Sequence, residues 1–152
     1  MPPDDVSKPR ITGRCYCGRV AISSRVRPET VAYCHCSDCR RWTGGPVAAF
    51  AAFDPRDLQV TPAFGAPFCA VPGVERWTCP DCGSALGARF DYLPDQIYVP
   101  VGLIDQIADL SPQTHSHFGE HIHWLHIDDT LPRETASARA TLSGAKSAAT
   151  GN

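Results

Sequence analysis

The sequence predicts an all-β or mainly β domain whose short strands meet at cysteine-bearing turns. Short runs of apolar residues recur with the two-residue period of a strand. Fourteen prolines and twelve glycines interrupt the 152-residue chain too often for long helices. Seven of the eight cysteines fall in three tight groups. The order of the apolar runs along the chain places these groups at the junctions between predicted strands.

The N-terminal half contains two predicted strands. Val20, Ile22 and Val26 share one parity in the run VAISSRV, as on a half-buried strand. The apolar run 47–53 begins after Pro46 and ends before a turn sequence, DPRD, so it is predicted to be a buried strand.

Two further strands are predicted later in the chain. Residues 96–101 (QIYVPV) are rich in strand formers, although Pro100 indicates an edge or bulge position because proline has no N–H to donate. Residues 121–127 (HIHWLHI) also favour a strand. Short helices are predicted to begin near Ser37 or Asp38 and near Asp105.

The composition predicts one folded unit with loose ends. Residues 1–10 are interpreted as a leader and 11–132 as the domain. Residues 133–152 contain Leu142 as their only large apolar side chain and are predicted to be a flexible tail, because they bury too little to offset their ordering entropy.

Composition also limits the partners and the compartment. A net charge of -2 and a pI near 6.3 argue against a nucleic-acid-binding surface. No apolar run approaches the ~20 residues that span a bilayer, and the N-terminus lacks the apolar core of a signal peptide. We therefore expect a cytoplasmic protein without membrane or nucleic-acid partners, in which clustered cysteines more often bind metal than form disulfides.

The three cysteine groups have metal-ligand spacing. They read CYCG from Cys15, CHCSDC from Cys34, and CPDCG from Cys79. Short spacing lets two sulfurs converge on one ion, and a following glycine lets the backbone turn sharply. Thiolate donors favour zinc, with an iron–sulfur cluster as the alternative. Thioredoxin-like redox chemistry at CPDC lacks the βαβ context that it needs.

These motifs resemble the glutathione-dependent formaldehyde-activating enzyme family, which includes the centromere protein V relatives. The resemblance runs from Gly13 to Pro132 and includes GRCYCGRV, YCHCSDCRRWTGGP, PGVERWTCPDCGSAL, PVGLID, PQTH and LHIDDTLP. The motifs YCHCSDCRRWTGGP and PGVERWTCPDCGSAL are the most specific in order and spacing. The family's fold is a β-rich zinc sandwich, sometimes called a β-tent, which agrees with the mainly β class predicted above.

The resemblance implies two zinc ions per chain. One would be structural, held by Cys15, Cys17, Cys79 and Cys82. The other would be catalytic, held by Cys34, Cys36 and Cys39 with a fourth position open, as in other catalytic zinc sites. The implied activity is that of a carbon–sulfur lyase acting on S-hydroxymethyl adducts of glutathione or another small thiol.

Several roles stay open at this stage. Arg40 and Arg41 either hold a glutathione carboxylate or are solvated surface residues. His115 matches a histidine of the family pattern and is expected to line the pocket as a proton carrier or supporting group. Cys69 is a possible fourth ligand that would close the second site, or a free thiol. The alternative to an enzyme is a non-catalytic zinc-binding module with a protein partner.

The remaining histidines of the 115–126 cluster are expected to be satisfied or surface imidazoles rather than metal ligands. If residues 121–127 form a strand, His121 and His123 share one face and His126 the other.

Overall fold

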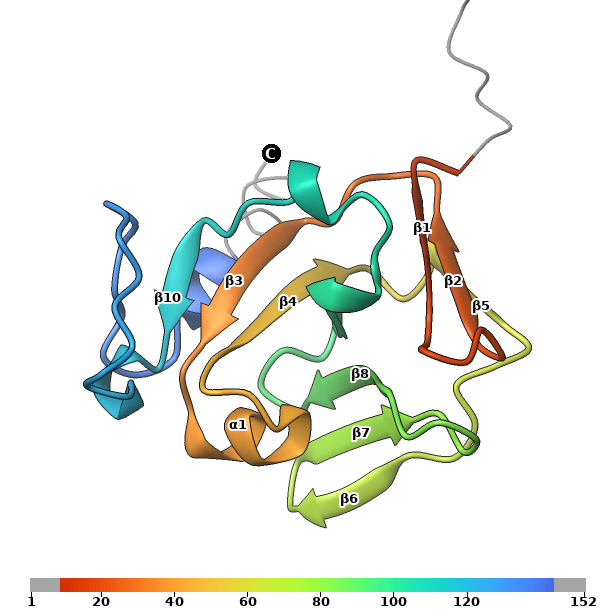
Figure 1. Ribbon diagram of the computed structural model, residues 1–152, viewed down its shortest axis with the longest axis horizontal. Coiled ribbons are helices and arrows are strands. Elements are labelled where there is room, and N and C mark those ends of the chain that lie inside the picture. The colour runs from red at the N-terminus through yellow and green to blue at the C-terminus, as the bar shows by residue number, and fades with distance from the viewer. Residues whose placement is uncertain (1–8, 144–152) are drawn as a thin grey trace, which may run out of the picture.

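The computed structural model describes residues 9–143 and confirms the mainly β class. Strands form a three-stranded sheet of order β1-β2-β5 and a seven-stranded sheet of order β10-β3-β4-β9-β8-β7-β6 (Figure 1). The small sheet consists of β1 (Ile11–Arg14), β2 (Ala21–Ser24) and β5 (Leu58–Thr61). The large sheet consists of β3 (Thr30–Cys34), β4 (Ala48–Phe53), β6 (Phe68–Val71), β7 (Val74–Thr78), β8 (Ala85–Phe90), β9 (Ile97–Pro100) and β10 (Thr114–Ser116).

Helical structure is short, as the prolines and glycines predicted. The α-helix α1 spans Ser37–Thr43, close to the predicted start, and ends at Gly44, whose φ of 78° is left-handed. Besides a helical stretch at residues 139–143, the described chain has three 3₁₀ turns: η1 (Val101–Leu103), η2 (Ile107–Asp109) and η3 (Phe118–Glu120). The helix expected near Asp105 is therefore only the single turn η2. Within residues 9–143 no helix has the length and apolar character needed to cross a membrane.

Strand β4 organises the interior, because both of its faces are buried. Ala51 and Phe53 point into the apolar cluster shared with Ile11 and Ile22 of the small sheet. Phe50, with Ala52, points into a second cluster on the opposite side of the strand. The unbroken apolar run that predicted a buried strand thus packs against both layers.

Two strand predictions need correction in detail. β2 ends at Ser24, so Val26 lies beyond it and is exposed. β9 is an interior strand between β4 and β8 rather than an edge or bulge strand. Pro100 is tolerated there because it is the last residue of β9, where the chain leaves the ladder and enters η1.

The strand predicted over residues 121–127 is absent from the structure. The stretch forms irregular backbone after η3, with one turn closed by Leu125 N–H and Ile122 O at 3.0 Å. The sheet edge next to it is already paired, because His115 N–H donates to Pro132 O and Glu134 N–H donates to His115 O, at 2.9 Å each. A strand without an available partner cannot satisfy its backbone groups, so strand propensity alone gave the wrong answer.

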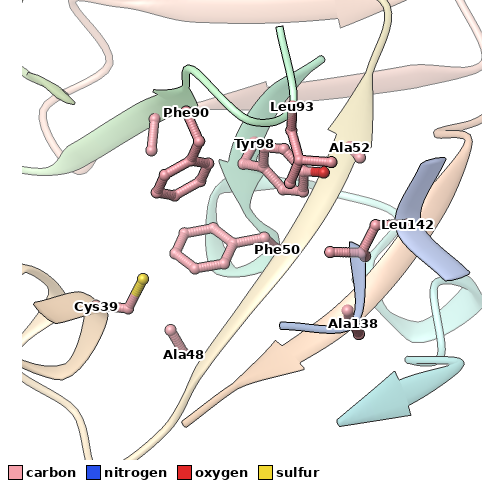
Figure 2. Packing of buried hydrophobic residues seen from close by; sticks show 11 residues of the cluster. Cys39, Ala48, Phe50, Ala52, Phe90, Leu93, Tyr98, Ala138 and Leu142 are labelled. Carbon is pink, nitrogen blue, oxygen red and sulfur yellow. The ribbon is translucent and has the colours of Figure 1, made fainter. Parts of the chain in front are cut away.

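Residues 133–143 are packed onto the large sheet, where composition predicted a flexible tail. After pairing beside β10, the chain turns helical over residues 139–143. Ala138 and Leu142 are 2% and 5% exposed and lie beside Phe50 and Tyr98 in the second cluster (Figure 2). The folded part therefore continues past Pro132, while the expectations for residues 1–8 and 144–152 fall outside the described residues.

Leu142→Ala is expected to destabilise the protein by about 2–3 kcal/mol, because it leaves a cavity in a shared core cluster. Thr141→Ala is the matched control, since Thr141 is exposed on the same helical turn and should change stability by less than about 0.5 kcal/mol. Urea unfolding of both variants measures the difference. Equal midpoints would mean that the C-terminal segment does not contribute to the core.

Candidate metal centres

Four cysteines from two distant turns converge at the junction of the two sheets. Cys15 and Cys17 follow β1 of the small sheet, and Cys79 and Cys82 follow β7 of the large sheet. The four sulfurs all lie within 4.8 Å of one another. The Cys15 Sγ is 3.6 Å from the Cys17 Sγ and 3.7 Å from the Cys79 Sγ. Four thiols at this spacing fit one tetrahedral metal ion.

The two turns are built in the same way. Gly18 and Gly83 have left-handed φ values of 81° and 76°, which glycine adopts without strain. Their N–H groups return to Cys15 O at 3.1 Å and Cys79 O at 2.9 Å. Val20 N–H also donates to Cys15 Sγ at 3.3 Å and thereby lowers the pKa of that thiol. Each turn therefore presents its sulfurs inward, as the glycine after each pair predicted.

Further contacts join the two turns to each other. Tyr16 N–H donates to Ser84 Oγ at 2.9 Å. The Ser84 hydroxyl is also 3.2 Å from Cys82 Sγ, and this contact is the main cause that lowers the Cys82 pKa to about 5. A half-exposed ion pair, Arg19 with Asp81 at 2.9 Å, adds little free energy. The four-cysteine set thus has the closed geometry of a structural site.

Three other cysteines meet between the end of β3 and the start of α1. Cys34 is the last residue of β3, Cys36 is the N-cap of α1, and Cys39 is buried in its first turn. The Cys34 and Cys36 sulfurs are 3.4 Å apart, and the three sulfurs lie within 4.8 Å of one another. Cys39 N–H donates to Cys36 Sγ at 3.3 Å, so the thiol acts as the helix cap.

The hydrogen bonds within this set favour the thiolate form of Cys36. The Cys34 thiol, and then that of Cys39, stabilise the Cys36 thiolate and lower its pKa to about 2. Donation to Cys36 correspondingly raises the pKa of Cys34. A ready thiolate among soft donors suits zinc. Among residues 9–143 no fourth histidine, cysteine or carboxylate joins the set.

A buried guanidinium lies against the three-cysteine set. Arg76 of β7 is 7% exposed, and its Nη2 donates to Cys39 Sγ at 3.5 Å and to Asp38 Oδ2 at 2.8 Å. Its guanidinium carbon stands 4.5 Å from the ring centroid of Trp42 and 5.6 Å from that of Phe90. Arg76 therefore brings a fixed positive charge to the sulfurs, within an aromatic enclosure.

A cavity of about 40 Å³ opens beside the three sulfurs. Cys39 points from α1 toward Phe50, at the edge of the core cluster that borders this cavity (Figure 2). The other walls are mainly aromatic and include Tyr33, Phe50, Phe90, Tyr92, Tyr98 and His117. The space suits one or a few atoms of a ligand rather than a whole tripeptide.

Residues 10–120 match the family described as glutathione-dependent formaldehyde-activating enzyme. The chain belongs to this family. The crystal structure of a Rhodobacter sphaeroides protein is also similar, with 21% sequence identity, a TM-score of 0.49, and coverage of 81% of this chain and 99% of that chain. No curated protein matches the chain.

Both cysteine sets of this family member lie inside the matched range. The two arginines predicted to support them, Arg40 and Arg41, differ in their contacts. The Nη1 of Arg40 donates hydrogen bonds to the main-chain carbonyls of both His35 and Glu120, so Arg40 connects α1 to η3. Arg41 is exposed on the next position of α1. Of the two arginines, Arg41 has the freer side chain for a ligand.

His115 does not line the cavity beside the cysteines, contrary to expectation. It is fully buried on the opposite face of β10, because neighbouring strand residues point to opposite faces. His117, two residues further along the chain, borders the cavity instead. Its left-handed φ of 54° turns the chain out of β10, and its Nδ1 is 3.8 Å from Glu120 Oε2.

Cys69 joins neither cysteine set. It lies on the edge strand β6, where its side chain is exposed, and β6 pairs only with β7. The structure therefore does not bring Cys69 to the fourth position of the three-cysteine set.

Proposed function

We propose that this family member is a zinc-dependent carbon–sulfur lyase that handles S-hydroxymethyl adducts of glutathione or another small thiol. The observation that carries the proposal is the three-cysteine set, which has three sulfurs within 4.8 Å, no fourth protein donor among residues 9–143, and an adjoining cavity. An open coordination position distinguishes catalytic from structural zinc sites.

Two zinc ions per chain would fill the two sets. At the four-cysteine set, Cys15 and Cys17 of one turn and Cys79 and Cys82 of the other would hold an ion that cross-links the two sheets. At the three-cysteine set, bound zinc would supply a Lewis acid that stabilises the sulfur of a small thiol as its thiolate. Three thiolates leave one net negative charge on such a centre, and Arg76 offsets that charge from 3.5 Å.

The chain's own residues can then serve the reaction. In the lyase direction, the carbon–sulfur bond of the adduct breaks, the sulfur keeps the electron pair, and the hydroxyl proton leaves as formaldehyde forms. His117, on the cavity wall and backed by Glu120, is placed to accept that proton. Arg41 on the exposed side of α1 is placed to attract a glutathione carboxylate.

The decisive variant is Cys36→Ser, with Cys69→Ser as the matched control outside both sets. Wild type and Cys69→Ser should bind two zinc ions and accelerate exchange between ¹³C-formaldehyde and its glutathione adduct, followed by NMR. Cys36→Ser should lose at least about 100-fold of that acceleration, because the ion that holds the thiol is released or displaced.

X-ray absorption at the zinc edge provides an independent measurement. Thiol-free wild type should show an average of about 3.5 sulfurs per zinc, since the two sets contain four and three cysteines, and this average should rise when glutathione is added. Four sulfurs on every ion without added thiol, together with no acceleration, would contradict the lyase and favour a zinc-binding module with a protein partner.

A further inference from the structure

The cavity beside the three-cysteine set is completed by a residue from the C-terminal segment. Leu142 borders this cavity and is 5% exposed. It lies beyond residues 10–120, the range that matches the family. One wall of the candidate site is therefore built by a part of the chain that the family match does not include.

Buried hydrogen bonds hold this segment against the cavity. Gln96 is 2% exposed, and its Nε2 donates to Leu142 O at 3.0 Å. The Tyr98 hydroxyl donates to Gln96 Oε1, which orients the amide. Ala138 N–H donates to Ser116 Oγ at 3.0 Å, and Ser116 also borders the cavity. The Leu142 side chain is thus a fixed part of the wall.

The register of the large sheet gives the cavity a direction. Cys34 pairs with Ala48, whereas Ala32 pairs with Phe50, so the step from Cys34 to Ala32 leads away from the start of β4. Cys34 and Ala32 both border the cavity and share a face of β3, since they are two residues apart. The cavity therefore extends along the sheet by roughly 7 Å, the rise of two strand residues.

Leu142 lies at the end of the cavity away from the sulfurs. Tyr98 borders the cavity and pairs with β4 beyond Phe50. Gln96, which bonds Leu142 O, precedes Tyr98 on the side still further from the sulfurs. Figure 2 shows the same arrangement, with Cys39 on one side of Phe50 and Leu142 on the other.

The two ends of the cavity differ in polarity. Near Cys34 the wall includes the hydroxyl of Ser116, its partner in the sheet, and the imidazole of His117. At the far end Leu142 lies among aromatic rings, and the Tyr98 hydroxyl there is already hydrogen-bonded. A 1-hydroxyalkyl group matches this order, with its hydroxyl near the sulfurs and its carbon chain at the apolar end.

The volume of the cavity limits the length of that chain. One water-sized group needs about 10–15 Å³, so a cavity of about 40 Å³ holds about three non-hydrogen atoms. A 1-hydroxyethyl group has three such atoms, and a 1-hydroxybutyl group has five. The thiol adduct of acetaldehyde therefore fits, and the adduct of butyraldehyde does not.

We propose that Leu142 sets the chain length of the aldehyde whose thiol adduct the site accepts, with a limit of about two carbons. This proposal rests on the proposed lyase function. In every adduct the same carbon–sulfur bond breaks, the sulfur keeps the electron pair, the hydroxyl proton leaves, and the corresponding aldehyde forms.

Exchange rates of glutathione adducts with different aldehydes test the proposal on the zinc-loaded protein. A methylene that a pocket cannot hold costs about 10–200-fold in kcat/KM, so wild type should accelerate exchange of the butyraldehyde adduct at least about 100-fold less than that of the acetaldehyde adduct. Leu142→Ala removes three carbons from the end wall and should reduce this difference at least about tenfold.

Leu110→Ala is the matched control. Leu110 is 4% exposed and packs in the core cluster on the other side of β4, so the variant loses the same carbons at similar burial. It should keep the wild-type difference between the two adducts. Leu142→Val removes a single carbon and serves if Leu142→Ala does not fold. It should improve the propionaldehyde adduct more than the butyraldehyde adduct.

Xenon provides a measurement that needs no catalysis, because it enters small apolar cavities. NMR shifts of Phe50 and Leu93, which border the cavity, report its entry. Leu142→Ala should respond at a xenon pressure at least about threefold lower than wild type or Leu110→Ala, since the cavity is larger.

An unchanged difference between the adducts in Leu142→Ala, or an equal change in Leu110→Ala, would overturn the proposal. So would a wild type that accepts the butyraldehyde adduct as readily as the acetaldehyde adduct. If no adduct exchanged faster than in buffer, the proposed function itself would fail. The xenon response would then decide whether Leu142 forms the end of the cavity, and equal responses in Leu142→Ala and wild type would exclude it.

Discussion

Replacing Cys79 with serine is expected to release one zinc ion and to remove most of the stability of the fold. Cys79 is 2% exposed, and its sulfur approaches sulfurs 64 and 62 residues away in sequence, those of Cys15 and Cys17. Binding free energy at a structural zinc site is folding free energy and reaches about 10 kcal/mol in zinc-finger peptides. We expect a loss on the order of 5 kcal/mol, comparable to the whole stability of many domains.

Thermal unfolding and metal analysis of the same preparations measure this effect. Cys69→Ser is the control for the loss of a thiol outside both sets, and it should unfold like wild type. Cys36→Ser should lose less stability than Cys79→Ser, because its set joins neighbouring segments while the four-cysteine set joins two sheets. Equal losses in Cys36→Ser and Cys79→Ser would contradict a structural role confined to the four-cysteine set.

Arg76→Met is expected to cost about 2 kcal/mol and to loosen the metal at the three-cysteine set. Methionine preserves the packing of the side-chain stem between Trp42 and Phe90, so the loss isolates the charge. The half-exposed Asp38 and the Cys39 sulfur would then lack their cationic partner, and the loss of hydrogen bonds to a charged group costs about 1.5–3 kcal/mol. Without that charge, the thiolates should release zinc to a competing chelator at least about tenfold faster.

Arg89→Met is the matched control, since Arg89 is exposed on the neighbouring strand β8 and should change neither quantity measurably. Arg76→Lys should recover only part of the metal retention, because an ammonium lacks the planar fork that bonds Asp38 and stacks on Trp42. If Arg76→Met released zinc to the chelator at the same rate as wild type, the guanidinium would not support the metal.

The two cysteine sets that could hold metal were largely predictable from the sequence, because their signal is local. A spacing of one or two residues between cysteines, followed by glycine, already determines the turn that gathers the sulfurs. β4 and the start of α1 were predictable for the same reason, the first from an unbroken apolar run and the second from Ser37 and Asp38. Assigning the cysteines to two sets required the family resemblance, since spacing alone leaves the partners open.

The residues that surround the sulfurs were not predictable by the same means. Arg76 lies inside the motif PGVERWTCPDCGSAL, and its signal was a charge at an inward position of a strand next to cysteines. His117 and His115 are two residues apart in one histidine-rich stretch, yet His117 borders the cavity beside the cysteines while His115 is fully buried and hydrogen-bonded to Asp129. Their roles depend on where β10 ends and on the segment that pairs beside it, both of which are tertiary facts.

That pairing has a consequence for how the chain avoids association. The outer edge of β10 is occupied by residues 132–134, which leave the ribosome only after all ten strands, so a nascent chain exposes an unpaired edge until this segment arrives. The opposite edge of the same sheet, β6, stays exposed with Phe68 and Val71 69% and 41% accessible. A chain truncated after Pro132 would expose two unpaired sheet edges instead of one, and we expect it to aggregate during synthesis.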